Sequence, residues 1–438
     1  MWCSAEKRAS NSPLLMIRVV MLWLICFYPA SATETSGRVG TGLEHTSNVR
    51  QSRLDKKSEF IQTTYAEIGV EEVRKRFKAD AKVKIENEHY FDNTYNDETS
   101  LTSGFGLFTI DLIEDFFEWG ATFSRTDVVS NSAEDENPDT TEYRNIARTG
   151  PTLNYAISRA TNFRANANYV VVENSEETAD DSQRAEGSAV INHQINRLTS
   201  INLNGRYSEI IESDNDEEIQ NSRAGFGFSR SYVDGVFNAS YGLQEVRSNL
   251  AATERGSFTD VSLSRENFLA HDVDLKYTHS ISDTSIGFED DESGIRDPAD
   301  PTQATSKTDI ETRDRVTLIV SRERTSFVYD LNLIYEESNF NLQNYTERYR
   351  GLIIGFAPKV YSRFSPRIQY SYLRESFGIN RSEGDDSTQT LQLSLNYQLV
   401  EDLFTDAFIE YKDRTNDSVS SRQYDEISLG LGVRWEFL

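Results

Sequence analysis

Hydrophobic and polar residues alternate along most of the chain, in stretches that are longer than ordinary strands. In 391–399 every second residue is apolar, and the residues between them are Gln, Ser and Asn. The stretches 162–171 and 429–437 show the same alternation. A period of two predicts a β-strand with one apolar and one polar face. Because strands of soluble proteins have about 5–6 residues, the length of these stretches favours strands that cross a membrane.

A weak internal repeat organises the middle of the chain. The segments SRATNFRANANY at 158–169 and NRLTSINLNGRY at 196–207 share an Arg, a Thr and a final Tyr at an offset of 38 residues. Two membrane strands with about 9–11 residues each in lipid, a short turn and a longer loop fill such a unit. Short connections such as NRLT alternate with long acidic ones such as ESDNDEEIQNS. This order predicts short periplasmic turns and long acidic outer loops.

These patterns predict an all-β fold: a transmembrane, antiparallel, up-and-down β-barrel of about 18–20 strands. The barrel proper is expected over 78–438. The segment 33–77 is either a separate N-terminal segment before 18 strands or the source of two further, fainter strands, near 37–47 and 58–70. Either total is even, which places both termini in the periplasm. The expected strands from residue 78 onwards are 78–91, 103–113, 116–128, 145–157, 162–174, 184–195, 199–212, 221–230, 233–247, 256–265, 271–282, 309–321, 326–338, 346–357, 366–377, 387–399, 402–413 and 421–437.

The last strand has the features of a barrel-closing strand. Its apolar residues end in Trp435 and Phe437, which fit the aromatic belt at the membrane interface. We therefore expect this strand to pair with the first strand of the barrel. The segment also resembles the C-terminal signal of outer-membrane barrels, although Leu438 follows the aromatic residue.

The N-terminus has the pattern of a secretory signal peptide over 1–32. Basic residues precede a short apolar run that ends in Ala30-Ser31-Ala32, and cleavage is expected after Ala32. Both cysteines, Cys3 and Cys26, lie in this leader, so the mature chain has neither disulfides nor a thiol nucleophile. Lipoprotein processing at Cys26 is disfavoured, because Ile25 stands where a small residue is required.

Composition and charge agree with a barrel whose strands face lipid on one side and water on the other. Hydrophobic residues make up 37% of the chain and the mean hydropathy is −0.58, yet Tyr (21) and Phe (24) are abundant. The net charge of −26 becomes −28 without the leader, which carries three basic residues and one acidic residue. Such acidity argues against nucleic acid as a partner. It suits acidic outer loops or a lumen that prefers cations.

Several segments carry a family resemblance. They are EHTSNVRQSRLDKKSEFIQT at 44–63, EHYFDNTYND at 88–97, the hairpin at 158–169 and YDEISLGLGVRWEF at 424–437. Together they resemble the β-barrel porins that accompany exopolysaccharide production systems. Ser47-Asn48 departs from the Asp-Asn that is usual in that family. The resemblance implies an outer-membrane pore or anchor connected with polysaccharide export or adhesion.

The polar face of the strands supplies the candidate lumen-lining residues. Amides and scattered aromatic rings suit sugar hydroxyls, whereas rings of charge set ion selectivity. The alternative is a generic wet interior or a network that fills the barrel. The candidates are Arg164, Asn166, Asn168, Asn204, Arg206, Asp330, Asn332, Arg367, Gln369, Asn396, Asp406, Glu410 and Arg434.

Catalytic and metal-binding patterns are weak. A barrel hydrolase would need a histidine with suitable partners, but His271 and Asp272 are adjacent and point to opposite faces of a strand. His279 is the other candidate. The acidic segments 213–218 and 289–300 lack the spacing of a calcium loop and are interpreted as solvated outer loops. We expect no catalytic residues, no metal site and no cofactor.

The sequence therefore predicts a porin-like channel in the bacterial outer membrane, for saccharide or exopolysaccharide passage. The alternative is a non-conducting barrel that anchors a polysaccharide export or adhesion system. Expected partners are outer-membrane lipid, lipopolysaccharide, the barrel assembly machinery and, as a further candidate, a polysaccharide. The long acidic loop 283–309 is a candidate constriction of the pore.

Overall fold

The computed structural model of the chain is one closed antiparallel sheet of 20 strands. The structure describes residues 33–129, 141–175, 181–212, 218–249, 253–283, 310–341, 344–360, 362–377, 384–419 and 422–437. The predicted leader 1–32 with Ala30 and Ala32, the acidic segment 289–300 and almost all of 213–218 and of loop 283–309 lie outside these residues. The strands are β1 (Thr33–Thr46), β2 (Glu59–Arg74), β3 (Phe77–Tyr90), β4 (Glu98–Ile113), β5 (Phe117–Val129), β6 (Thr141–Ser158), β7 (Thr161–Asn174), β8 (Ser182–Asn196), β9 (Thr199–Glu212), β10 (Glu218–Tyr232), β11 (Gly235–Ser248), β12 (Glu254–Phe268), β13 (His271–Asp283), β14 (Ile310–Glu323), β15 (Phe327–Phe340), β16 (Tyr345–Pro358), β17 (Phe364–Phe377), β18 (Asp385–Val400), β19 (Leu403–Asn416) and β20 (Tyr424–Phe437).

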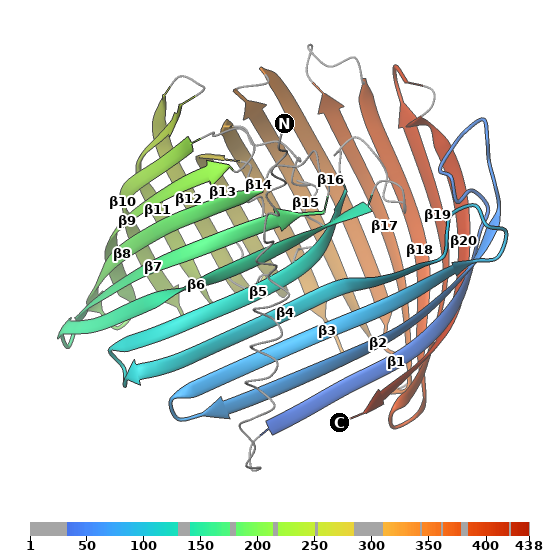
Figure 1. Ribbon diagram of the computed structural model, residues 1–438, viewed down its shortest axis with the longest axis horizontal. Coiled ribbons are helices and arrows are strands. Elements are labelled where there is room, and N and C mark those ends of the chain that lie inside the picture. The colour runs from blue at the N-terminus through green and yellow to red at the C-terminus, as the bar shows by residue number, and fades with distance from the viewer. Residues whose placement is uncertain are drawn as a thin grey trace, which may run out of the picture.

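Every strand pairs with the strand before it and the strand after it, and β20 closes the sheet on β1. The closing ladder runs from Gly37 opposite Phe437 to Thr46 opposite Ser428. Figure 1 shows one continuous wall of tilted strands, with the start of β1 near the end of β20. A closed sheet leaves no strand edge exposed. The predicted up-and-down barrel and the pairing of the last strand with the first are therefore confirmed.

The connections differ between the two ends of the barrel. Two-residue turns occupy 75–76, 197–198 and 401–402 at one end, whereas 47–58 and 91–97 are longer connections at the other end. In bacterial barrels the short turns face the periplasm. The first residues of β1 and the last residues of β20 lie at the short-turn end. The segment 33–77 contributes β1 and β2 to the same wall as the strands that follow it.

The strands are longer than a membrane crossing requires. The shortest have 13 residues and the longest, β6, has 18. About 9–11 residues of a tilted strand span the lipid. The strands therefore extend beyond the membrane and contribute to the packing at the long-loop end.

The alternation of the sequence becomes two chemically different faces. Leu203 in β9 and Phe226 in β10 are directly paired and are 62% and 57% exposed. Asn202 and Asn204 point to the opposite face, because successive side chains of a strand alternate. Fully buried side chains such as Ile210 share the face of Asn204, which is possible only if that face is the inner one.

The outer face is a continuous apolar surface. Exposed aliphatic or aromatic residues line this face from Val39 in β1 to Phe437 in β20. In the part of the chain that the structure describes, no helix is long and apolar enough to cross a membrane. A closed barrel with an apolar exterior is the architecture of outer-membrane proteins. The predicted location in the bacterial outer membrane is confirmed.

Candidate functional site: the inner face of the barrel

All thirteen candidate lumen residues lie on the inner face. The register places each of them in a row with other inner residues of the neighbouring strands, since directly paired residues share a face. Their function in permeation stays a prediction. The set is Arg164, Asn166 and Asn168 in β7, Asn204 and Arg206 in β9, Asp330 and Asn332 in β15, Arg367 and Gln369 in β17, Asn396 in β18, Asp406 and Glu410 in β19, and Arg434 in β20.

A charged sector covers the inner face where the barrel closes. The Glu67 carboxylate in β2 lies 2.6 Å from a guanidinium nitrogen of Arg38 in β1 and 3.0 Å from Nζ of Lys82 in β3. Next to it, Lys84 and Glu86 form a second pair at 2.6 Å. Cations and carboxylates alternate along this part of the wall. The sector therefore carries many charges but little local excess of either sign.

The same sector continues across β19 and β20. Arg434 lies 3.2 Å from the Asp406 carboxylate and 2.9 Å from the Glu436 carboxylate. Asn396 Nδ2 donates to Asp406 at 2.5 Å. The Arg434 guanidinium also lies 5.0 Å from the centre of the Phe404 ring. Three candidate residues, Asn396, Asp406 and Arg434, are thus joined in one polar network.

An amide-rich polar sector lies on β7 to β12, and it also contains the inner-facing Arg164 and Arg206. Ser188 Oγ donates to Asn166 Oδ1 at 2.8 Å, and Asn204 Nδ2 donates to Asn202 Oδ1 at 3.0 Å. On the same face, Asn238 in β11 lies opposite Ser262 in β12, and their side chains are hydrogen-bonded at 3.2 Å. Each amide still has further donor or acceptor capacity. The sector offers hydrogen-bonding groups to a neutral polar solute.

A glycine makes room for the ion pair between β15 and β17. Asp330 and Arg367 lie on either side of Gly355 in β16, and the Arg367 guanidinium donates to both Asp330 oxygens at 2.9 and 3.1 Å. A Cβ atom at Gly355 would lie 2.5 Å from Asp330 Oδ1. Because Gly355 has no side chain, Asp330 and Arg367 can form an ion pair across β16.

Charged side chains are buried on the inner face near the long-loop end. The Glu186 carboxylate in β8 lies 2.9 Å from Arg206, 3.5 Å from Arg148, and accepts a hydrogen bond from Asn168 at 3.1 Å. Such burial of a carboxylate is tolerated because several donors surround it. Arg206 and Asn168, predicted as pore-lining residues, thus take part in a structural network.

A second buried charge network lies on β18 and β19. The Asp386 carboxylate accepts hydrogen bonds from Arg414 at 2.7 Å and Asn416 at 2.6 Å, and it pairs with Arg422. The long-loop end of the barrel is therefore a packed layer, whereas the polar side chains farther down the wall are partly exposed.

The two histidines considered for catalysis have different hydrogen-bonding partners. His279 Nδ1 lies 2.9 Å from Asp314 Oδ1, which also accepts a hydrogen bond from the Tyr277 hydroxyl at 3.0 Å. His271 lies at the short-turn end, with Nδ1 2.8 Å from the carbonyl oxygen of Leu269. Within the described ranges, no group of three or more His, Cys, Asp or Glu residues is placed to hold a metal ion.

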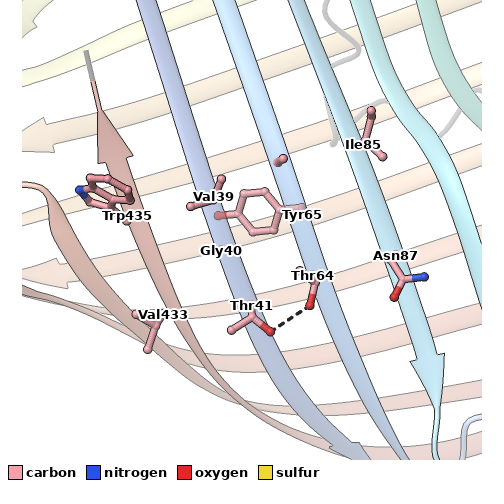
Figure 2. Close-up of a pocket in the computed structure, with 10 residues that line it drawn as sticks. Val39, Gly40, Thr41, Thr64, Tyr65, Ile85, Asn87, Val433 and Trp435 are labelled. Atoms are coloured by element: carbon pink, nitrogen blue, oxygen red, sulfur yellow. Dashed lines mark hydrogen bonds between the residues drawn. The ribbon is translucent and has the colours of Figure 1, made fainter.

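A groove of about 540 Å³ lies on the outer face at the junction of β20, β1, β2 and β3. The hydroxyls of Thr41 and Thr64 bond each other at 3.1 Å, and Asn87 Nδ2 donates to Thr99 Oγ1 at 2.8 Å. Figure 2 shows Trp435 and Val433 on one side of this groove and Ile85 on the other. Because its polar groups are paired, the groove belongs to the lipid-facing surface. Its lining residues are Val39, Gly40, Thr41, Thr64, Tyr65, Ala66, Ile85, Asn87, Val433 and Trp435.

Inward-facing aromatic rings were missed as candidate site residues. Phe404 and Phe408 share the inner face with Asp406 and Glu410. Tyr65 likewise lies inside, opposite Gly40. The signal was present in the sequence, because Phe404 and Phe408 have the same parity as Asp406 along the strand. Aromatic residues at inner positions were overlooked since bulky apolar residues usually mark the lipid face.

No family model matches the chain, and no curated protein matches it. Its fold is similar to that of the FrpB iron transporter from Neisseria meningitidis (F5-1 variant), with a TM-score of 0.52, 7% identity, and 93% of this chain and 83% of that chain covered. It is also similar to a mutant of the ferric enterobactin receptor PfeA from Pseudomonas aeruginosa, with a TM-score of 0.54, 9% identity, and coverages of 94% and 81%. At these identities the likeness shows the fold alone. The resemblance to porins is therefore confirmed only as far as an outer-membrane β-barrel.

Proposed function

We propose that the protein is an outer-membrane channel for neutral polar solutes, with saccharides as the substrate class. The amide-rich sector on β7 to β12 carries this proposal. Its amides and hydroxyls supply both donors and acceptors, which match the hydroxyl groups of a sugar. Barrels of about 16–18 strands enclose an aqueous channel, so a wall of 20 strands provides sufficient circumference.

Local charge pairing supports a neutral substrate over an ion. Glu67 is flanked by Arg38 and Lys82, and Asp330 is bound by Arg367. Paired charges give a weaker field in the lumen than a ring of one sign, and such rings are what selective ion channels use. The proposal includes no catalytic step and no cofactor.

A non-conducting barrel that anchors a polysaccharide export or adhesion system is the second candidate. The packed charge networks around Glu186 and Asp386 favour it, since they reduce the free space at the long-loop end. An anchoring barrel would need no continuous water path. Conductance separates the two candidates.

Substituting two amides of the amide-rich sector tests the substrate class. The double variant Asn202→Ala, Asn204→Ala removes neighbouring hydrogen-bonding groups from the inner face. Two lost hydrogen bonds of about 0.5–1.5 kcal/mol each predict block of the channel current by an oligosaccharide that is weaker by roughly 5- to 150-fold. The measurement is the concentration of sugar that halves the single-channel current.

The matched control is Gln389→Ala, because Gln389 lies on the outer face of β18 and contacts Tyr370 there. This control should leave sugar block unchanged. Equal block of the double variant and the native protein would rule out the amide-rich sector as the saccharide path.

A further inference from the structure

At the long-loop end of the barrel, the end of β13 separates from its neighbour β12, and the end of β14 stays paired with β13. The ladder between β12 and β13 extends only as far as Thr259 opposite His279. The ladder between β13 and β14 continues to Asp283 opposite Ile310. These two strand ends therefore stay paired with each other after β13 has left the wall.

A glutamine side chain replaces the missing strand partner. Gln244 lies on the inner face of β11 and is 5% exposed. Its Oε1 accepts a hydrogen bond from the backbone nitrogen of Ile281 at 3.3 Å, and its Nε2 donates to the carbonyl oxygen of the same residue. The amide thus satisfies the backbone of β13 as a peptide group of β12 would. Because Gln244 points inward, the end of β13 lies inside the wall.

A hydrophobic cluster fixes this inner layer. Ile281 and Ile310 belong to the two strand ends, whereas the other members belong to β9, β10 and β11. The five side chains form one packed cluster, so the two strand ends cover inner side chains of β9, β10 and β11. Gly256 in β12 provides space, because a Cβ atom there would lie 2.7 Å from Ile281 Cδ1. The members with their exposures are Ile210 0%, Ile219 0%, Val246 0%, Ile281 5% and Ile310 0%.

The opposite face of the layer is polar. Arg313 in β14 donates to both carboxylate oxygens of Glu311 at 2.9 Å, and it lies 3.8 Å from Glu336 in β15. Arg315 lies 3.7 Å from the same Glu336. The strand ends are therefore amphipathic, with isoleucines against the wall and a buried network of paired charges on the opposite face.

We propose that this inner layer, formed by residues 280–283 and 310–313, narrows the outer mouth of the channel and sets the largest solute that passes. Gln244 and Ile281 are the residues that hold it in place. The inference rests on the proposed channel function. A strand pair that lies inside the wall occupies space that would otherwise belong to the mouth.

A reversible cross-link tests the proposal. Residues 33–438 contain no cysteine, since Cys3 and Cys26 both lie in the predicted leader. The variant Gln244→Ala, Gly256→Cys, Ile281→Cys removes the glutamine contact and replaces it with a disulfide. The substituted positions are close, because a Cβ atom at Gly256 would lie 3.7 Å from Ile281 Cγ1, within the reach of a disulfide.

The measurement is single-channel conductance and the size of polyethylene glycol that enters, before and after reduction. Oxidised protein should behave like the native channel. Reduction should raise the conductance and admit larger polymers, because the layer then loses its attachment. Native protein treated with the same reductant is the control, and thiol labelling verifies the disulfide.

The outcomes separate this inference from the proposed function. A channel that conducts equally in both redox states overturns the inner-layer inference and leaves the channel function intact. A folded barrel that is silent in both states overturns both. If the triple variant does not fold, Gln244→Leu serves instead, because it removes both hydrogen bonds while keeping a side chain of similar length. An unchanged polymer limit in that variant also overturns the inference.

Discussion

At the scale of single residues, glycine and aromatic side chains complement each other across the inner face. Phe258 in β12 lies in the same row as Gly242 in β11 and Gly225 in β10. Its ring is only 6% exposed, and a Cβ atom at Gly225 would lie 2.5 Å from Phe258 Cζ. The ring thus covers two positions that have no side chain, which shields their backbone from water.

Replacing Gly242 with Val should destabilise the barrel by about 1–3 kcal/mol, the usual cost of overpacking a filled site. The new side chain would collide with the Phe258 ring and with the carbonyl oxygen of Ala224. The measurement is unfolding by urea in detergent. The folded fraction is read from gel mobility, because a folded barrel shifts its mobility on heating. The control is Gly205→Ala, where the nearest atom is a backbone oxygen at 3.7 Å. Equal stability of both variants would contradict this packing.

Single charges on the inner face should control the weak ion preference of the lumen. Glu67→Gln removes the carboxylate that Arg38 and Lys82 share, which leaves two cations together. The reversal potential in a salt gradient should then move toward anion preference.

The control for this change is Glu114→Gln, which removes one negative charge from the turn between β4 and β5. Hydrogen bonds from Lys75 and Arg76 lower the pKa of Glu114, so this carboxyl is charged at neutral pH. It lies outside the lumen and its substitution should not alter the reversal potential. An identical response of the two variants would show that Glu67 does not face the ion path.

At the scale of elements, the sequence predicts a strand well where its residues alternate strictly between the lipid-facing and the lumen-facing side. Alternation identified the inner candidates in β7 and β18 because one face is lipid and the other is water. The two fainter strands, near 37–47 and 58–70, correspond to β1 and β2. Their weaker signal has a physical cause, since β1 carries Gly37, Gly40 and Gly42 where other strands carry larger residues.

The inner layer could not be predicted in this way. Parity along β13 assigns Ile281 to the same face as Tyr277, which is the outer face. The assignment fails because the strand end leaves the wall, so that its outward side packs against β11 instead of lipid. The contact between Gln244 and Ile281 joins residues 37 positions apart. A local pattern contains no information about such a contact.

The closing strand should be sensitive to charge on its lipid face. Leu431 in β20 is 62% exposed and pairs with Leu43 in β1. Leu431→Lys should cost about 2–4 kcal/mol if the site lies near the middle of the membrane. The measurement is the yield of folded, heat-modifiable barrel in vesicles. The control is Ser394→Lys on the inner face of β18, and equal loss in both variants would contradict the assignment of faces.

At the scale of the whole molecule, all described elements contribute to one closed wall of 20 strands. Paired charges, an amide-rich polar sector and a packed outer mouth divide its inner face into regions. The acidic net charge of −26 is a property of the complete chain, whereas the inner charges near Glu67 and Asp330 are locally balanced. On the proposed function, the wall serves solute passage and the mouth limits solute size.

Single-channel conductance of the refolded mature protein in a planar bilayer tests this account most directly, with neutral sugars of increasing size added. The account predicts stable current steps, weak preference between cations and anions, and partial block by sugars that enter. It also predicts that block ceases above a defined sugar size. A correctly folded, heat-resistant barrel that carries no current would contradict the channel function and favour a structural, anchoring barrel.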